Sequence, residues 1–164
     1  MKQLEAYKQG TLKTHYKVAR VVDGDGLIAY NIFDKKEIEI RLLGIDAPEI
    51  KKCKKLLQDE LETHVPGQLL IKLGQASFKY LSSLIPKETS INIYTEASNT
   101  IDVYGRTLAY VFLPDGSCIN ETLVREGYAK PYNRFFCSQL SNYQVLGFEA
   151  KTKRKGNFQL VSSF

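Results

Sequence analysis

Cysteine and histidine are scarce in this sequence, and their positions argue against two common kinds of small-protein scaffold. Cys53, Cys118 and Cys137 are far apart and odd in number, and no C-x-x-C pair occurs. Neither His15 nor His64 lies at ligand spacing from a cysteine, so a zinc site is not expected. A disulfide framework is not expected either, although an oxidising compartment would permit one pair.

Long hydrophobic runs are also missing. No apolar run approaches the length needed to cross a bilayer, so no membrane span is expected. Residues 1–12 are polar and contain lysines, without the apolar core of a signal peptide. This pattern permits either a cytosolic protein or a mature form whose leader has been removed, and both alternatives stay open.

What is present is the composition of an ordinary globular domain. The 164 residues are 43% hydrophobic and 25% charged, enough for one domain with its own core. Residues 1–14 lack periodicity and are expected to form a flexible N-terminal arm, followed by a single domain over residues 15–164. The net charge of +5 suits a polyanionic partner but does not by itself identify one.

Short alternating segments predict the strands. Residues 16–22, 27–33 and 37–43 are expected to form three strands joined by tight turns, and residues 90–95 and 107–113 form two more. Such a meander is typical of a small barrel. We therefore predict an α+β fold, mainly β, built on a five-stranded OB-type barrel.

Three helices are expected beside the barrel. Residues 67–85 carry apolar residues at helical spacing and end at Pro86, which predicts an amphipathic helix that closes the core. A short helix is expected over residues 121–126, and a last helix from residue 138 or 139 to 155, with Gly156 as its stop. The charged segment 50–66 is longer than a usual connection, which indicates a mobile or a functional loop.

The stretch at residues 38–49 organises the rest of the chain. It begins as an alternating strand that contains Arg41, and it ends in a turn that Pro48 makes rigid. Asp46 and Glu49 are therefore held at the exit of that strand. An earlier glycine-rich bend adds Asp25 and Asp23, and Asp23 is expected to order the turn. Carboxylates that lie close together repel each other, so such a cluster usually needs a divalent cation or a shared proton.

Three motifs in order carry a family resemblance. They are residues 22–25 (VDGD) with 40–49 (IRLLGIDAPE), then 102–110 (DVYGRTLAY), then 120–130 (NETLVREGYAK). Together they resemble the staphylococcal nuclease, or thermonuclease, family over nearly the whole chain. The resemblance implies an OB-type barrel with three helices and calcium-dependent cleavage of DNA and RNA, with little sequence preference and 3′-phosphate ends.

The residue types suit hydrolysis of a phosphodiester, which needs a cation, a base and fixed positive donors. Asp25 and Asp46 offer oxygen ligands to a hard ion such as Ca²⁺. Glu49 lies close enough to act on a water beside it, and Arg41 and Arg106 are forks that match phosphate geometry. Each arginine alone has a structural alternative, an ion pair with a nearby glutamate or a place in a hairpin turn.

The resemblance assigns the same roles. It implies that Asp25, Asp46 and the backbone carbonyl of Ala47 bind calcium and that Glu49 is the general base. It implies further that Arg41 and Arg106 bind phosphate and that Tyr104 lines the nucleotide pocket. Tyr132 is the candidate for stacking on a base, with packing against the barrel as the alternative. The chain departs from the family pattern at Gly26, Ala47 and Val103.

We therefore expect a monomeric nuclease that acts on DNA and RNA, with single-stranded or frayed substrates favoured. One alternative is a non-catalytic OB-type module that binds nucleic acid or protein. Another is a basic architectural DNA-binding protein, which would bind without turnover. A degenerate module is expected to have lost the base, one arginine or the aspartates, whereas this chain has them all.

Overall fold

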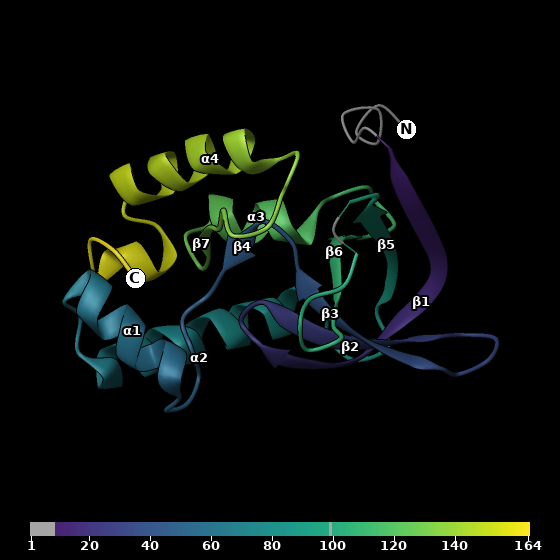
Figure 1. The fold of residues 1–164 in the computed structure, drawn as a ribbon, viewed down its shortest axis with the longest axis horizontal. Coiled ribbons are helices and arrows are strands. Elements are labelled where there is room, and N and C mark those ends of the chain that lie inside the picture. The colour runs from purple at the N-terminus through teal and green to yellow at the C-terminus, as the bar shows by residue number, and fades with distance from the viewer. Residues whose placement is uncertain (1–8, 99) are drawn as a thin grey trace.

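A computed structural model describes residues 9–98 and 100–164. A closed five-stranded barrel lies at the right of Figure 1, with helices beside it. The order around the barrel is β1-β2-β3-β6-β5. Strand β3 pairs with β6 in parallel, and the other neighbouring strands of the barrel pair antiparallel. The strands are β1 (Gly10–Asp23), β2 (Gly26–Asn31), β3 (Glu37–Leu42), β5 (Ser90–Glu96) and β6 (Thr107–Phe112). The predicted α+β fold with a five-stranded barrel is confirmed.

Alternation explains why these segments are strands. In β2, Leu27 and Ala29 are fully buried while Ile28 and Tyr30 are only half-buried, as expected where one face of a strand meets the core. In β6, five consecutive residues after Thr107 are buried, because the helix at residues 119–125 also packs against this strand. The interior of the barrel is therefore filled with aliphatic and tyrosine side chains.

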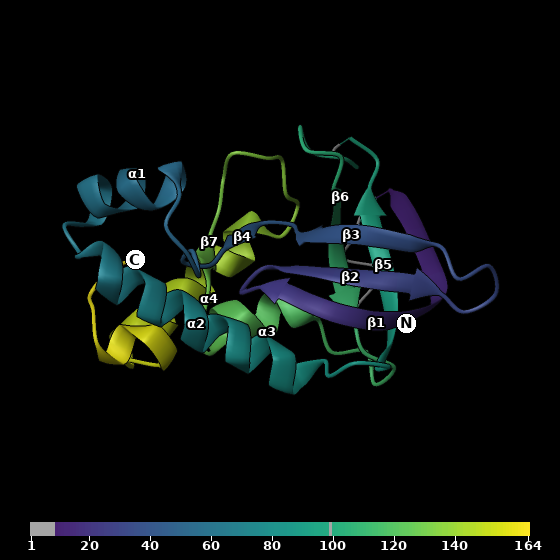
Figure 2. The ribbon, with the colours of Figure 1, turned by 90° about the horizontal axis from the view of Figure 1, so that it is seen from below.

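Helix α2 (Gly67–Leu84) joins the barrel to a second, smaller core (Figure 2). Its Leu81 packs in the barrel core, whereas its Leu70 and Leu73 pack in a cluster with Leu56 and Phe158. This is the predicted amphipathic helix, and it ends one residue before its predicted limit. The helices at the left of Figure 2 are thereby anchored to the barrel.

The prediction of three helices is wrong by one. The described residues contain four α-helices: α1 (Lys54–Thr63), α2, α3 (Ile119–Arg125) and α4 (Leu140–Thr152). A 3-10 helix, Gly156–Gln159, follows α4, so the last helix ends before the predicted residue 155. Helix α1 lies in the segment expected to be a mobile or functional loop. Only Leu56 and Asp59 are buried along this charged helix. Its sequence therefore shows little of the apolar spacing from which a helix is predicted.

Strand β1 begins earlier than predicted. Residues 10–14 were assigned to the flexible arm, but they belong to β1 and pair with β5. Residues 1–8 of that arm lie outside the described residues. A two-stranded sheet of β4 (Ile45–Asp46) and β7 (Lys130–Pro131) was not predicted. No helix among the residues described by the structure is long and apolar enough to span a membrane.

Gly44 makes the turn that leads from β3 into β4. Its φ is +80°, a conformation that an L side chain rarely adopts. A Cβ at this position would also collide with the sulfur of Cys137. The glycine therefore lets β3 bend sharply, so that Asp46 comes back beside Arg41.

Candidate active site

Arg41 lies near the end of β3 and is almost completely buried. Its Nη1 donates to the carbonyl oxygens of Leu42 at 3.0 Å and Ile45 at 2.9 Å. Its Nη2 lies 3.1 Å from Asp46 Oδ1 and 3.2 Å from Asp25 Oδ2. The guanidinium is thus fixed by four contacts, and its acidic partners are aspartates rather than a nearby glutamate.

Asp25 comes from the bend between β1 and β2. Its Oδ2 accepts a hydrogen bond of 2.7 Å from the backbone N–H of Ala47, and its own N–H donates to Asp23 Oδ1 at 3.1 Å. Asp23 therefore orders the turn, as expected. Burial raises the pKa of Asp25 to about 6, and Asp23 adds to this rise while Arg41 opposes it.

Lys55 on α1 reaches into the same carboxylate cluster. Its Nζ lies 3.1 Å from Asp46 Oδ2, 3.3 Å from Glu49 Oε1 and 3.2 Å from Asp59 Oδ2. Burial alone would lower the pKa of Lys55, but the three carboxylates raise it. This contact was missed because α1 was not predicted. Lys55 and Asp59 stand four residues apart in the sequence, and that spacing was the available signal.

Arg106 lies in the connection between β5 and β6, and its side chain is more exposed to solvent than that of Arg41. Its Nε donates to Asp102 Oδ2 at 2.8 Å and its backbone N–H donates to Asp102 Oδ1 at 2.9 Å. Its guanidinium lies 5.5 Å from the ring centre of Tyr104, which is 81% exposed. Burial would raise the pKa of Asp102, but the hydrogen bonds from Arg106 and Tyr104 lower it. Asp102 was not predicted as a site residue.

Tyr132 follows β7, and its ring lies near the guanidinium groups of Arg41 and Arg134. Its N–H donates to the carbonyl of Gly44 at 2.9 Å. The guanidinium of Arg41 lies 5.7 Å from its ring centre, and that of Arg134 lies 6.0 Å away. The tyrosine is half-buried and forms a wall beside the buried arginine.

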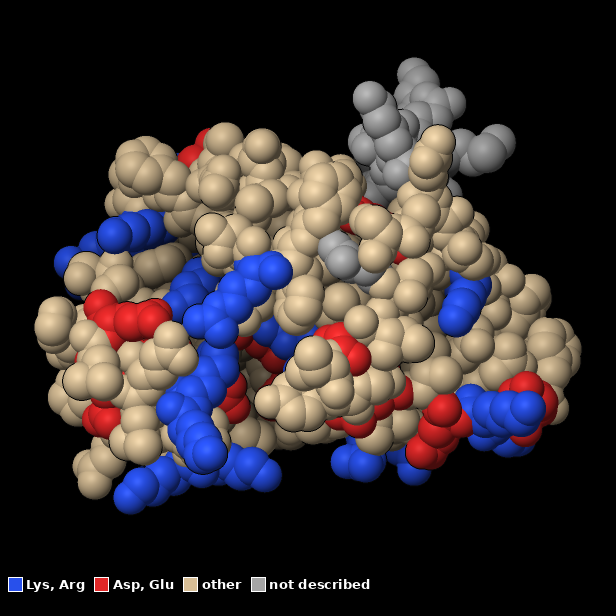
Figure 3. Space-filling view, in the orientation of Figure 1, with Lys and Arg blue, Asp and Glu red and all other residues tan. Residues whose placement is uncertain are grey.

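A cleft of about 560 Å³ brings these side chains together. Figure 3 shows acidic and basic side chains gathered around a hollow near the middle of one face. Ala47 is buried and reaches the site through its hydrogen bond to Asp25. The predicted site residues that line the cleft are Asp25, Arg41, Asp46, Glu49, Tyr104, Arg106 and Tyr132.

The donors in the cleft fit a hard, partly hydrated cation. One nitrogen of Arg41 lies within 3.2 Å of oxygens of both Asp25 and Asp46, so these two carboxylates lie close together beside the guanidinium. Oxygen donors without sulfur or imidazole suit Ca²⁺ better than Zn²⁺. The described residues contain no cluster of three or more acidic, histidine or cysteine side chains that could hold a metal. A cation here would therefore keep waters or use backbone oxygens as well.

Comparison with known proteins identifies the family. Residues 39–158 match the family described as staphylococcal nuclease homologue. The chain belongs to this family. The match begins after Asp25, yet the structure brings Asp25 to Arg41 at 3.2 Å, so the N-terminal bend belongs to the same site.

Several curated proteins are similar to the chain. A protein of Escherichia coli O157:H7 named an uncharacterized endonuclease is 32% identical over 142 residues, which cover 87% of this chain and 75% of the relative. The thermonuclease of Staphylococcus hyicus is 31% identical over 70% of this chain and 57% of its own length. Endonuclease YncB of Bacillus subtilis is 30% identical over 68% of this chain and 44% of its own length.

Proposed function

We propose that this chain is a calcium-dependent nuclease that hydrolyses the phosphodiester bonds of DNA and RNA with little sequence preference and leaves 3′-phosphate ends. The observation that carries the proposal is the convergence of Arg41, Asp25, Asp46 and Glu49 with Arg106 in one cleft. Membership of the staphylococcal nuclease family and relatives named thermonuclease and endonuclease support the same reaction.

The two arginines bind the scissile phosphate in this proposal. Arg41 is held in place by backbone carbonyls and aspartates, so its charge is in position before the reaction starts. Fixed donors of this kind stabilise the charge that develops on the phosphate oxygens in the transition state. Arg106 comes from the connection between β5 and β6. Its planar guanidinium can pair with two oxygens of the same phosphate.

Glu49 is the proposed general base. Its carboxylate lines the cleft and is about a quarter exposed, so that a water can reach it. It takes a proton from the water that attacks phosphorus, and the bond to the 5′ oxygen breaks, which leaves the phosphate on the 3′ side. Lys55 holds Glu49 Oε1 at 3.3 Å, and this contact orients the carboxylate.

Asp25, Asp46 and the carbonyl of Ala47 are the residues that would hold calcium. When bound there, the ion supplies Lewis-acid polarisation of the phosphate. Asp46 already uses one oxygen for Arg41 and the other for Lys55, so Lys55 has to leave this carboxylate for full coordination. In this proposal Tyr104 and Tyr132, which both line the cleft, contact the sugar and base of the bound nucleotide.

The alternative function is a non-catalytic OB-type module that binds nucleic acid or protein. It predicts binding without turnover. The presence of Glu49 in the cleft favours the enzyme, because a binding module has no use for a base placed beside the phosphate site.

The test is cleavage of single-stranded DNA and of RNA by the purified chain, in calcium and in excess chelator. We expect cleavage in calcium, none in chelator, and products that a 3′-phosphatase can dephosphorylate. A folded chain that binds both nucleic acids without cleaving either in calcium would contradict the enzyme and favour the binding module.

A further inference from the structure

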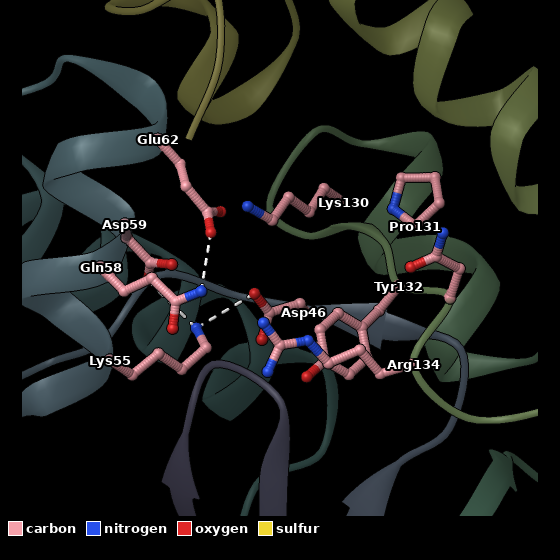
Figure 4. A pocket seen from close by; sticks show the side chains of 10 residues that line it. Asp46, Lys55, Gln58, Asp59, Glu62, Lys130, Pro131, Tyr132 and Arg134 are labelled. Carbon is pink, nitrogen blue, oxygen red and sulfur yellow. Dashed lines mark hydrogen bonds and ion pairs between the residues drawn. The ribbon is translucent and has the colours of Figure 1, made fainter.

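A second hollow opens next to the cleft. It has a volume of about 280 Å³ and lies between α1 and residues 130–134 (Figure 4). The residues that line both this hollow and the cleft are Asp46, Lys55, Gln58, Tyr132 and Arg134. The two spaces are therefore neighbours, and a strand bound with one phosphate at Arg41 has the second hollow beside it.

One wall is a single polar face of α1. Lys55, Gln58, Asp59 and Glu62 follow at helical spacings of three and four residues, and in Figure 4 they point into the hollow. Gln58 Nε2 donates to Glu62 Oε1 at 2.7 Å, and Lys55 Nζ lies 3.2 Å from Asp59 Oδ2. The amide nitrogen of Gln58 and the ammonium of Lys55 therefore already bind acceptor oxygens on the same helix.

What this wall offers to a ligand is therefore mostly acceptor oxygens. Gln58 Oε1 and the second carboxylate oxygen of Glu62 accept no hydrogen bond from the described residues. Both side chains are exposed, so a ligand can reach these oxygens. A group that carries N–H donors fits this wall, whereas a phosphate would be repelled by Glu62 and Asp59.

The opposite wall is basic. Lys130 and Arg134 line it, and neither forms an ion pair with a carboxylate in the part of the chain that the structure describes. Arg134 lies over the ring of Tyr132 at 6.0 Å. The hollow is consequently polarised, with oxygens on the α1 side and cationic donors on the other.

We propose that this hollow is a nucleotide subsite for the residue adjoining the cleaved bond, with its base against Gln58 and Glu62 and its phosphate toward Lys130 and Arg134. Adenine and cytosine carry an exocyclic amino donor, whereas thymine has a carbonyl oxygen at the corresponding position. The acceptor wall therefore favours adenine or cytosine over thymine at this one position. This inference rests on the proposed function and adds one local base preference to it.

The test is a binding measurement that does not depend on cleavage. Thymidine pentanucleotides with phosphorothioate linkages receive adenosine or cytidine at each position in turn. Their affinity for the full chain is measured by fluorescence anisotropy, in calcium and in chelator. At one position, replacing thymidine is expected to tighten binding about tenfold, the size of one good base contact.

Two variants and one matched control decide the source of that gain. Gln58→Ala and Glu62→Gln are expected to reduce it to less than about twofold, because each removes part of the acceptor wall. Glu37→Gln is the matched control, because it makes the same charge change as Glu62→Gln. Glu37 lies at the exposed start of β3, at the far end of the barrel from α1 (Figure 2). This variant is expected to keep the gain in affinity. Circular dichroism checks that each variant folds.

Equal affinity for thymidine, adenosine and cytidine at every position would overturn the subsite. A gain that survives in both α1 variants would overturn it as well. Failure of the proposed function looks different: the binding preference would appear in chelator or calcium while unmodified pentanucleotides stay uncleaved.

Discussion

The two arginines of the cleft stand in contrasting surroundings. The Arg41 side chain is 9% exposed and touches two carbonyls and two aspartates, so the end of β3 and the turn into β4 hold it rigidly. The Arg106 side chain is 25% exposed and pairs with Asp102 alone among the described acids. The difference indicates one half of the cleft that is formed in advance and another that can adapt to the substrate.

The carboxylates beside these arginines show the same contrast. The pKa of Asp25 rises to about 6, because burial outweighs the opposing effect of Arg41. The pKa of Asp102 falls, because hydrogen bonds from Arg106 and Tyr104 outweigh the effect of burial. The rigid half therefore carries a carboxylate that is costly to ionise, a property suited to a cation site, whereas the open half carries a stable ion pair.

The largest expected effect concerns Glu49, in the rigid half. Glu49→Gln is expected to reduce turnover about 10²- to 10⁴-fold, the range of general-base contributions. The affinity for a non-cleavable nucleotide should change far less, because Gln has almost the same shape. Steady-state cleavage and calorimetric nucleotide binding measure the two, with Glu37→Gln as the charge-matched control. Equal losses in rate and affinity would make Glu49 a structural residue.

Stability should separate the two arginines. Arg41→Met leaves Asp25 and Asp46 buried without their shared partner and is expected to cost about 3–5 kcal/mol of unfolding free energy. Arg106→Met should cost about 1 kcal/mol or less, because that pair is more exposed and Asp102 keeps its backbone N–H donors. Urea denaturation in chelator measures both. Similar costs would mean that the two halves are equally rigid.

The pH dependence of stability should have opposite signs at the two aspartates. The folded pKa of Asp25 lies above its ordinary value of 3.8, so its contribution is present below pH 3.8 and is lost as pH rises to about 6. The total is about 3 kcal/mol at 1.36 kcal/mol per unit. The folded pKa of Asp102 is lowered, so its contribution is present above its unfolded pKa and is lost in acid.

Difference curves against Asp25→Asn and Asp102→Asn isolate these two effects. The free energy of wild type minus that of Asp25→Asn should fall between pH 4 and pH 7, and the corresponding Asp102 difference should not. A rising difference for Asp25 would show that Arg41 outweighs burial there.

The smallest expected effect concerns Lys55. Because its ammonium lies on Asp46 and Glu49, it competes with a cation for the same oxygens. Lys55→Gln is expected to tighten calcium binding about fivefold, the size of one partly exposed ion pair. Lys54→Gln is the control, since Lys54 lines the same cleft but forms no ion pair with the described acids. Calorimetry measures the calcium affinity of both variants. If the affinity rises equally in both, the change in net charge explains the effect and the ion pairs of Lys55 do not.

The barrel and the site differ in how far the sequence predicts them. Strands such as β2 and β3 were predictable because one face of each is buried and alternation follows from that. The structure brings Arg41, Asp46 and Glu49 of the motif at residues 38–49 together in one cleft. The roles of these residues and of calcium stay predictions.

Other features left no readable signal. Helix α1 is charged and buries little, so its helical period is weak and Lys55 could not be placed. The β4–β7 pair has two residues in each strand, too few for a pattern. Asp102 was expected only as part of a motif, because its hydrogen bonds to Arg106 depend on a turn in which Gly105 has φ +80°.

The most direct measurement is saturation kinetics of Arg41→Lys and Arg106→Lys on a short oligonucleotide, with circular dichroism showing that both fold. Lysine keeps the charge but lacks the planar fork. We predict that Arg41→Lys lowers kcat much more than it weakens substrate affinity, because Arg41 is fixed where charge develops. Arg106→Lys should impair both. Near wild-type turnover in either variant, or a loss for Arg41→Lys confined to affinity, would contradict the division of the cleft into a preformed and an adaptable half.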